Sequence, residues 1–340
     1  MGWSALCGAL DNTASKASAE SRPFAALLLP LSSPAFAQAA QAVDDGCRAA
    51  LAVEDQPLAL QVSRTDATPE SILAAYRSAV ERGAAIVLGP LTRDGVTALA
   101  RTALSGPPIL ALNAPDADTP RPPRFVVFGL SAESEARTAA QNAFLSGARR
   151  AAVVESDAPL SRRVSRAFVD EWQSLGGTVS EHLDAGADPE LMRRRMERSR
   201  ADMVFLATDG DGARAARPYL NNEIPAYATS LVHERREDPL SAVDLDGIRF
   251  VDMPWLVQPD HPAVMVYPRQ PGSLEFQRFY ALGIDACRLA PLIAAGRESA
   301  ELDGVTGHLR LAHGAVERDP VPATFRGGSA VAADASETPR

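Results

Sequence analysis

Hydrophobic and polar positions alternate along this chain in blocks that are typical of β-α units. From residue 24 onward, short apolar runs of strand length are separated by stretches in which apolar residues recur every three or four positions. This alternation predicts a parallel sheet with crossover helices. The strands of this first sheet are predicted at 24–29, 58–63, 85–88, 108–112 and 125–128.

The helix signals are clearest between the second and third of these strands. Thr68 can cap a helix, Pro69 suits its first turn and Gly83 can end it. An apolar stripe at helical spacing indicates the buried face. The stripe contains Ile72, Tyr76, Ala79 and Val80.

The same alternation resumes after residue 130 and predicts a second sheet. Ser131 can cap a helix whose first turn carries Glu133 and Glu135, where the helix dipole favours acidic residues. Further strands are predicted at 151–154, 178–182, 203–207 and 225–229, with helices between them. The expected fold is therefore α/β and two-lobed, with two doubly wound parallel sheets.

The pattern also gives expected lobe boundaries. Lobe one is expected to contain residues 23–128 with about 250–300, and lobe two 129–249 with about 301–326. Residues 1–22 are polar and without periodicity, and 327–340 are rich in small residues, so both segments are expected to be disordered extensions.

Residues 21–40, SRPFAALLLPLSSPAFAQAA, fit two interpretations. An arginine, an apolar run and a small-residue triplet at 35–37 are typical of a secretory signal peptide. The regular alternation instead favours a strand at 24–29 followed by a crossover helix at 34–53. Acidic residues ahead of the apolar run are unusual for a leader, so the strand interpretation is preferred.

Composition narrows the class of protein. The chain has 340 residues, 46% of them hydrophobic, and a net charge of −9, which is an ordinary globular composition that disfavours nucleic-acid binding. The arginine-rich run at 193–200 is interrupted by Glu197 and is expected to be a solvated helix face. No apolar stretch approaches the roughly 20 residues that a membrane-spanning helix needs.

Three cysteines are too few for a disulfide framework and lack metal-ligand spacing. Cys47 and Cys287 lie on apolar helical faces and are expected to be buried as small hydrophobic residues. The faces contain Phe36, Ala40, Val43 and Ala50 around Cys47, and Phe276, Tyr280, Gly283 and Ala290 around Cys287. Cys7 loosely resembles the lipid-attachment cysteine of bacterial lipoproteins, although the six residues before it are too few for an export signal.

Motifs that carry catalysis or bind metals and cofactors are not recognisable. The sequence contains no Gly-rich dinucleotide loop, P-loop, HExxH or GxSxG motif, and its histidines are scattered. TDGDG at 208–212 lacks the glutamate of a calcium loop, since Leu220 stands in its place, and is expected to be a strand-to-helix turn. We therefore predict no catalytic residue, metal ligand or cofactor, and no enzymatic activity.

Several motifs resemble known families. The succession of GPLTRDGV, ALN and FGLS, with a late helix at 280–290 and a hairpin at 302–318, resembles the type I periplasmic-binding-protein fold over about 24–326. Five motifs more narrowly resemble the LppC-type lipoproteins, which are outer-membrane activators of penicillin-binding proteins. They are GLSAESEAR (129–137), FVDEWQSLGG (168–177), YATSL (227–231), VDMPWL (251–256) and YALGIDA (280–286).

This resemblance implies a non-enzymatic periplasmic protein that binds and activates a bifunctional penicillin-binding protein, which is a peptidoglycan synthase. In the family such proteins are tethered to the outer membrane as lipoproteins, whereas this chain has no clear export signal. The alternative is a solute receptor that closes its interlobe cleft on an amino acid or similar small ligand. Such a receptor needs charged partners for the ligand, which Thr92 with Arg93 or Asp94 could supply.

The fold predicts where a ligand site would be. In open α/β sheets, ligands bind beyond the carboxyl ends of the strands, which face the interlobe cleft in a two-lobed protein. The residues expected there are Ser32, Ser33, Leu91, Thr92, Asn113, Asp157 and Asp209. Each can instead serve as a helix cap, and for Thr92 and Asp209 this alternative has at least as much support as ligand contact. Trp255, just after an expected lobe crossing at 249–254, is either a cleft platform or a hinge packing residue.

Overall fold

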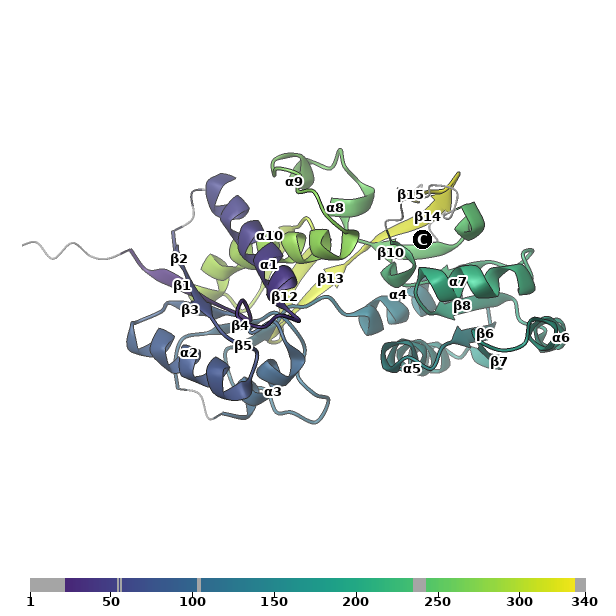
Figure 1. Ribbon diagram of the computed structural model, residues 1–340, viewed down its shortest axis with the longest axis horizontal. Coiled ribbons are helices and arrows are strands. Elements are labelled where there is room, and N and C mark those ends of the chain that lie inside the picture. The colour runs from purple at the N-terminus through teal and green to yellow at the C-terminus, as the bar shows by residue number, and fades with distance from the viewer. Residues whose placement is uncertain (1–21, 54, 56, 103–104, 235–242, 334–340) are drawn as a thin grey trace, which may run out of the picture.

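The computed structural model describes residues 22–333 except 54, 56, 103–104 and 235–242, and it has two lobes side by side (Figure 1). Each lobe is built on one sheet. The lobe-one sheet contains β1 (Phe24–Leu29), β2 (Ala59–Arg64), β3 (Ile86–Leu88), β4 (Ile109–Ala111), β5 (Phe125–Val127), β11 (Ala300–Asp303), β12 (His308–Ala312) and β13 (Ala315–Asp319). Their spatial order is β11-β12-β13-β5-β4-β3-β1-β2.

The strands of this sheet divide into a parallel core and an antiparallel edge. β1 to β5 pair in parallel, whereas β11, β12 and β13 form antiparallel hairpins, of which β13 joins the core beside β5. β1 lies inside the sheet, and all six residues of its sequence FAALLL are buried. Continuous burial is typical of a strand covered on both faces, which confirms the strand interpretation of 24–29.

Helices cover both faces of the lobe-one sheet. One face carries α1 (Ala37–Val53) and α10 (Leu274–Ala294), and the other carries α2 (Pro69–Glu81) and α3 (Arg93–Arg101). α2 begins as its sequence predicts, since the Thr68 side chain accepts a hydrogen bond from the Ser71 backbone N–H at 3.3 Å. Gly83 has a positive φ of 76° just beyond the end of this helix.

Lobe two repeats the same plan. Its sheet contains β6 (Arg150–Glu155), β7 (Thr178–Asp184), β8 (Met203–Ala207), β9 (Ala226–Ala228), β10 (Arg249–Asp252), β14 (Val321–Arg326) and β15 (Ser329–Ala332), in the order β15-β14-β10-β9-β8-β6-β7. α4 (Ala132–Leu145) and α5 (Pro159–Ser174) cover one face, and α6 (Pro189–Ser199) and α7 (Gly210–Ala216) the other. Antiparallel β14 and β15 extend its parallel core.

Short helices lie between these elements. They are the 3₁₀ helices η1 (Arg217–Tyr219) and η2 (Ser230–Val232), and the single-turn helices α8 (Pro254–Val257) and α9 (Pro262–Met265). The two-lobed α/β fold with doubly wound sheets is thus confirmed, with the addition that both sheets are mixed at one edge.

The helices α1 and α10, which share one face of the lobe-one sheet, pack unusually closely. A Cβ atom on Gly283 of α10 would overlap the carbonyl oxygen of Val43 on α1, and one on Gly46 would overlap the carbonyl oxygen of Tyr280. Glycine at both positions therefore lets the two backbones touch. At this crossing Cys47 and Cys287 form a disulfide, with a Cα–Cα distance of 5.3 Å. Both cysteines are buried, as predicted, but they are bonded to each other rather than packed as separate small hydrophobic residues.

Three segments connect the lobes, and they shift the expected boundaries. The chain crosses between β5 and α4, after β10, and at Pro320 between β13 and β14. The expected boundary at about 301 differs from the structure, because the strands of 300–319 pair with lobe one. The expected tail differs too, since residues 329–332 pair with β14. Residues 1–21 and 334–340 lie outside the described part.

Candidate functional site

Three of the residues expected from the sequence meet in one hollow at the strand ends of lobe one. Leu91 and Thr92 follow β3, Asn113 follows β4, and all three line a cavity of about 400 Å³ that we call the strand-end hollow. Its other walls are mainly apolar. They include Phe36, Leu112, Leu130, Phe279 and Leu282.

The polar side chains of the strand-end hollow mostly serve the protein itself. Asn113 Nδ2 donates to the Leu91 carbonyl at 3.0 Å, and Asn113 Oδ1 accepts the Ala114 N–H at 2.9 Å, so the amide holds two loops together. Thr92 stands at the N-cap of α3 without a side-chain cap bond, and its buried Oγ1 has no hydrogen-bond partner among the described residues. Arg93 and Asp94, the charged residues expected beside Thr92 in an amino-acid receptor, also line the hollow, so mainly apolar walls are combined here with one arginine and one aspartate.

The other expected residues lie elsewhere. Ser32 and Ser33 form backbone turn contacts and are not among the residues that line the described hollows. Asp157 has an almost fully exposed side chain that pairs with Arg162 at 2.7 Å. Asp209 caps α7 by accepting the Gly212 N–H at 2.9 Å. The structure thus favours the capping alternative for Asp209.

Trp255 lies in the core next to the second lobe crossing. Its side chain is fully buried, its ring centroid lies 5.3 Å from that of Tyr280, and the Arg269 guanidinium lies 4.2 Å from its centroid. Its backbone N–H donates to the Val305 carbonyl at 2.9 Å. A ring enclosed in this way cannot receive a ligand, so the structure favours the hinge-packing alternative.

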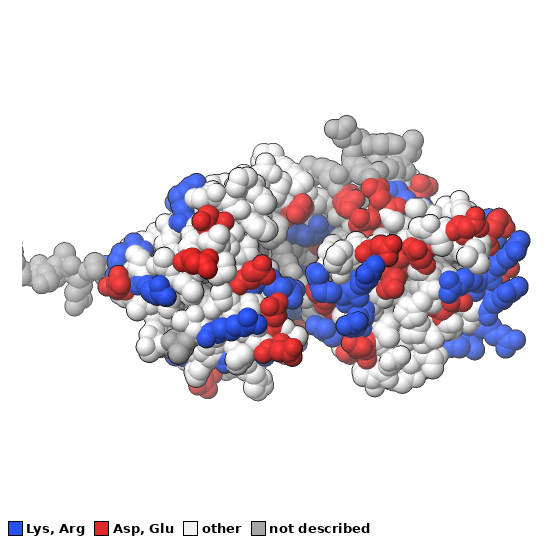
Figure 2. All heavy atoms as spheres, turned by 60° about the horizontal axis from the view of Figure 1, so that its bottom comes forward, with Lys and Arg blue, Asp and Glu red and all other residues white. Residues whose placement is uncertain are grey.

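A second hollow lies between the lobes and is strongly charged. It has a volume of about 470 Å³, and we call it the interlobe notch. One wall comes from lobe one and the other from α4 of lobe two, and Figure 2 shows acidic and basic side chains gathered on both sides of the gap. Its charged lining consists of Arg93, Arg121, Arg137, Arg310, Arg318, Glu133, Glu135, Glu317 and Asp319.

At the rim of the notch, Glu133 connects the lobes. Its Oε1 accepts a bond from Arg163 of lobe two at 2.9 Å and lies 3.7 Å from Arg93 Nη2 of lobe one. Burial by itself would raise the pKa of Glu133, but the hydrogen bond and positive charge of Arg163, with the charge of Arg93, bring the pKa below its ordinary value. Glu133 is therefore held as a carboxylate.

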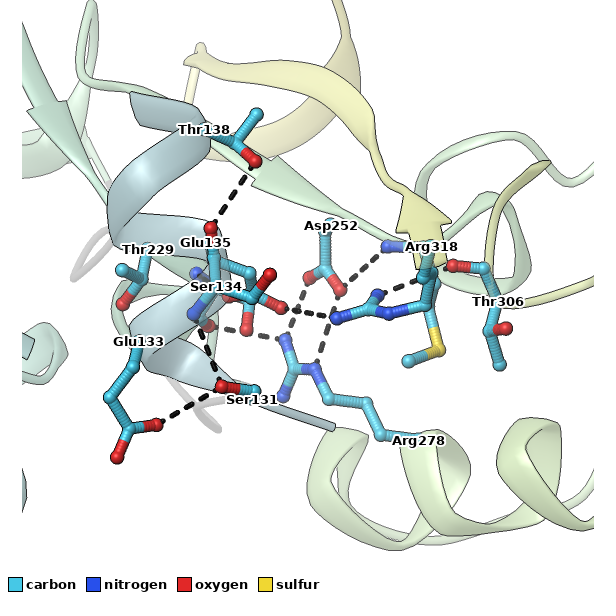
Figure 3. Close-up of polar contacts among 12 residues, drawn as sticks. Ser131, Glu133, Ser134, Glu135, Thr138, Thr229, Asp252, Arg278, Thr306 and Arg318 are labelled. Carbon is cyan, nitrogen blue, oxygen red and sulfur yellow. Dashed lines mark hydrogen bonds and ion pairs between the residues drawn. The ribbon is translucent and has the colours of Figure 1, made fainter. Parts of the chain in front are cut away.

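The region where the three connecting segments cross between the lobes is called the hinge. Deeper in the notch, Glu135 and Arg318 form a buried ion pair across the hinge (Figure 3). Glu135 belongs to α4 of lobe two and Arg318 to β13 of lobe one, and their side chains are 3.0 Å apart and each 7% exposed. Both side chains also form hydrogen bonds with the backbone. Glu135 accepts the Ser230 N–H at 2.9 Å, and Arg318 donates to the Thr306 carbonyl at 3.3 Å.

Asp252 and Arg278 form a second buried ion pair between the lobes. Arg278 of α10 donates to Asp252 Oδ2 at 2.7 Å and also to the carbonyls of Ser230 and His233. Asp252, at the end of β10, accepts the Met253 N–H and lies 2.7 Å from His233 Nδ1. Burial alone would raise the pKa of Asp252, but the Arg278 charge and the bonds from His233 and Arg278 lower it to about 2.

The residues of these interlobe ion pairs were not predicted from the sequence, although two of them lie in motifs that were noted. Glu135 lies in GLSAESEAR and Asp252 in VDMPWL, which were noted only for their resemblance to a family. The available signal is that Arg278 lies on a helix whose neighbouring residues Gln277, Tyr280 and Ala281 are buried. A charge on such a face needs a partner, but the sequence does not say which one.

The ion pairs join the two lobes, and charged side chains line the interlobe notch. Among the described residues, no group of three or more His, Cys, Asp or Glu side chains could hold a metal ion. Within the same part of the chain, no helix has the length and apolar character needed to cross a membrane. The charges of the hinge are paired with one another, as expected for structural ion pairs rather than for acid or base catalysts.

A comparison with protein families shows which family the chain belongs to. The model of the family described as "LppC putative lipoprotein" matches residues 18–188 and 181–328, which is most of the sequence. The chain belongs to the LppC family. The penicillin-binding protein activator LpoA of Edwardsiella piscicida is 27% identical to this LppC chain over 292 residues, covering 72% of this chain and 42% of that protein. LpoA of Serratia proteamaculans (strain 568) is 26% identical over 328 residues, covering 80% and 47%.

Solved structures give the same fold. The "LpoA (YraM) C-domain from Haemophilus influenzae, a regulator of PBP1A" has a TM-score of 0.78 and 24% identity, covering 91% of this LppC chain and 99% of that one. A "putative branched-chain amino acid ABC transporter from Chromobacterium violaceum ATCC 12472" has a TM-score of 0.77 and 34% identity, covering 89% and 100%. The periplasmic-binding-protein-like fold is confirmed. The LppC chain spans less than half the length of the curated relatives quoted above.

Proposed function

We propose that this LppC-family chain is a non-enzymatic activator that binds a bifunctional penicillin-binding protein and favours the active conformation of that peptidoglycan synthase. The observation that carries the proposal is the match to curated relatives named as penicillin-binding protein activators, which extends over 72% of the chain or more in the two relatives quoted. The relatives are named as activators of a penicillin-binding protein, and the Haemophilus influenzae structure as a regulator of PBP1A, so the effect on the reaction would come from binding.

The hinge gives this proposal a physical basis. A binding partner changes a synthase only by its differential affinity for the two conformations of that enzyme. A rigid body exerts such a preference more effectively than a flexible one, because less free energy is lost in ordering it on binding. The ion pairs Glu135–Arg318 and Asp252–Arg278 fix the relative position of the lobes, so both lobes can contact the synthase as one body.

The disulfide supports a location outside the cytoplasm. Disulfides persist in oxidising compartments such as the bacterial periplasm and are rare in the reducing cytosol. The Cys47–Cys287 bond links two helices in the core of lobe one. Together with membership of a family described as lipoproteins, it favours a periplasmic protein that is tethered to the outer membrane.

The test uses the purified chain and the purified bifunctional synthase of the same organism. Glycan-strand synthesis from lipid-linked precursor should rise with added chain and then saturate, as expected for one binding site. The chain without synthase should leave the precursor unchanged, and heat-denatured chain should not activate. Absence of both binding and activation across a range of moderate salt concentrations would refute the proposal.

A solute receptor is the second candidate, and one observation favours it. The strand-end hollow is lined by apolar residues, and the Chromobacterium violaceum structure, whose title names a branched-chain amino acid transporter, is 34% identical. A ligand present at 100 times its dissociation constant adds about 2.7 kcal/mol to the free energy of unfolding. Thermal unfolding with millimolar leucine, isoleucine or valine therefore separates the candidates, because only a receptor is stabilised.

A further inference from the structure

The charges that line the interlobe notch do not balance. Each of its four carboxylates has an arginine partner. These pairs are Glu133 with Arg163 and Arg93, Glu135 with Arg318, and Glu317 and Asp319 with Arg310. Arg121 and Arg137 line the same notch, are exposed, and have no acidic partner among the described residues. The lining thus has five arginines and four carboxylates, an excess of one positive charge, because Glu317 and Asp319 share Arg310. This excess lies in a chain whose net charge is −9.

The two unpaired arginines come from opposite walls. Arg121 belongs to the segment between β4 and β5 in lobe one, and Arg137 to α4 in lobe two. Arg137 could have paired with Glu133 one turn earlier on α4, but the Glu133 carboxylate is engaged by Arg163 and Arg93. Because Glu133 is bound by these two arginines, the Arg137 guanidinium stays available for a ligand.

A charged hollow of this kind favours an anion. Low-dielectric walls concentrate the field of unpaired charges, which raises the local concentration of ligands of opposite sign. Guanidinium groups bind phosphate and carboxylate in a bidentate manner, through two parallel N–H···O bonds. Ser134 and Thr138, which lie on the same wall of α4 as Arg137, add hydroxyl groups to the lining.

We propose that the interlobe notch binds a small ligand with at least two acidic groups, phosphate or carboxylate, of which Arg121 holds one and Arg137 the other. This site differs from the strand-end hollow, whose lining is mainly apolar. Because the ligand contacts both lobes, its binding stabilises their present arrangement. The inference does not rest on the activator function, since it concerns the chain without a synthase.

The test is a calorimetric titration of the purified chain with two probes, pyrophosphate and tricarballylate, at low ionic strength matched with sodium chloride. We expect at least one probe to bind. Arg121→Ala and Arg137→Ala should each weaken that binding about tenfold or more, because each removes a charge-assisted bidentate contact. Preference for pyrophosphate would indicate a phosphate ligand, and preference for tricarballylate a carboxylate ligand.

The matched control is Arg194→Ala. Arg194 is also exposed and without a described interaction, but it lies on α6, whose residues do not line the notch. This variant should bind as the unchanged chain does. Circular dichroism of all variants checks that they fold. Failure of both probes to bind at millimolar concentration, or equal weakening by Arg194→Ala, would overturn the proposal, whatever the result of the synthase assay.

Discussion

The contact between α1 and α10 and the hinge between the lobes both join segments far apart in sequence, but by opposite physical means. The helices meet through glycines, apolar side chains and the Cys47–Cys287 disulfide. The hinge is joined by buried ion pairs, Glu135–Arg318 and Asp252–Arg278. The first contact stabilises one lobe internally, and the second fixes one lobe against the other.

The difference predicts how each contact fails. Apolar packing loses free energy in proportion to the atoms removed, and a disulfide is lost only to a reductant or a substitution. A buried ion pair fails abruptly, because removing one partner leaves an uncompensated charge away from water. The α1–α10 contact should therefore respond to reductant and be insensitive to acid, and the hinge should behave in the opposite way.

The largest effect is expected from Arg278→Met. The variant leaves the Asp252 carboxylate buried without its cation and also removes the donor to two carbonyls, so the free energy of unfolding should fall by about 3–5 kcal/mol. Urea denaturation measures the change. Asp252→Asn combined with Arg278→Met should recover part of the loss, because no buried charge remains. A change below about 0.5 kcal/mol, as expected for Arg194→Met, would contradict this view of the hinge.

Removing the disulfide should have the next largest effect. Cys47→Ala combined with Cys287→Ala is expected to lower the free energy of unfolding by about 3 kcal/mol, within the range typical of native disulfides, since the bond restricts the unfolded chain. Dithiothreitol should bring the unchanged chain to the stability of the variant and leave the variant unaffected. If reductant has no effect on the unchanged chain, the bond does not contribute in solution.

Acid should weaken the hinge within a defined pH range. The folded-state pKa of Asp252 is about 2, below its ordinary value of 3.8, so its contribution is complete above about pH 4 and is lost as the pH falls towards 2. Denaturation curves of the unchanged chain and of Asp252→Asn should converge across this range. Parallel curves would show that Asp252 is not held ionised by Arg278.

The smallest effect is expected at the rim of the notch. Arg93→Met removes an interlobe pair whose arginine is 39% exposed and whose N–O distance is 3.7 Å. Water screens such a pair, so the free energy of unfolding should change by less than about 0.5 kcal/mol. Urea denaturation beside Arg278→Met compares the two directly. A loss as large as that of Arg278→Met would mean that the rim, rather than the buried network, holds the lobes together.

Local patterns in the sequence were sufficient to predict the strands β1 to β9 and the longer helices between them. The continuous run FAALLL predicted a buried strand, and Thr68 and Ser131 marked helix starts that the structure confirms by their cap bonds. These signals lie within one element and depend only on period and capping. The step into the second lobe after residue 128 was predicted for the same reason, since a new β-α series begins there.

Contacts between distant elements were beyond the reach of such patterns. The apolar faces around Cys47 and Cys287 were recognised, but nothing in either segment shows that the two faces pack on each other. The hinge pairs were missed because Glu135 has the local pattern of an acid in the first turn of a helix, and the buried face beside Arg278 indicates that this charge needs a partner but not which one. The lobe assignment of 300–319 depends on the pairing of β13 with β5, which is also a long-range property.

The triple crossing between the lobes has a consequence for the order in which the protein can form during synthesis. Ala315 of β13 pairs with Val127, and β10 pairs with residues 321–324 of β14. Neither sheet is thus complete until residues near the end of the described chain have left the ribosome. Until then each incomplete sheet has an unpaired edge strand, which can form hydrogen bonds with another chain. Pairing of the last strands therefore removes these open edges from both sheets.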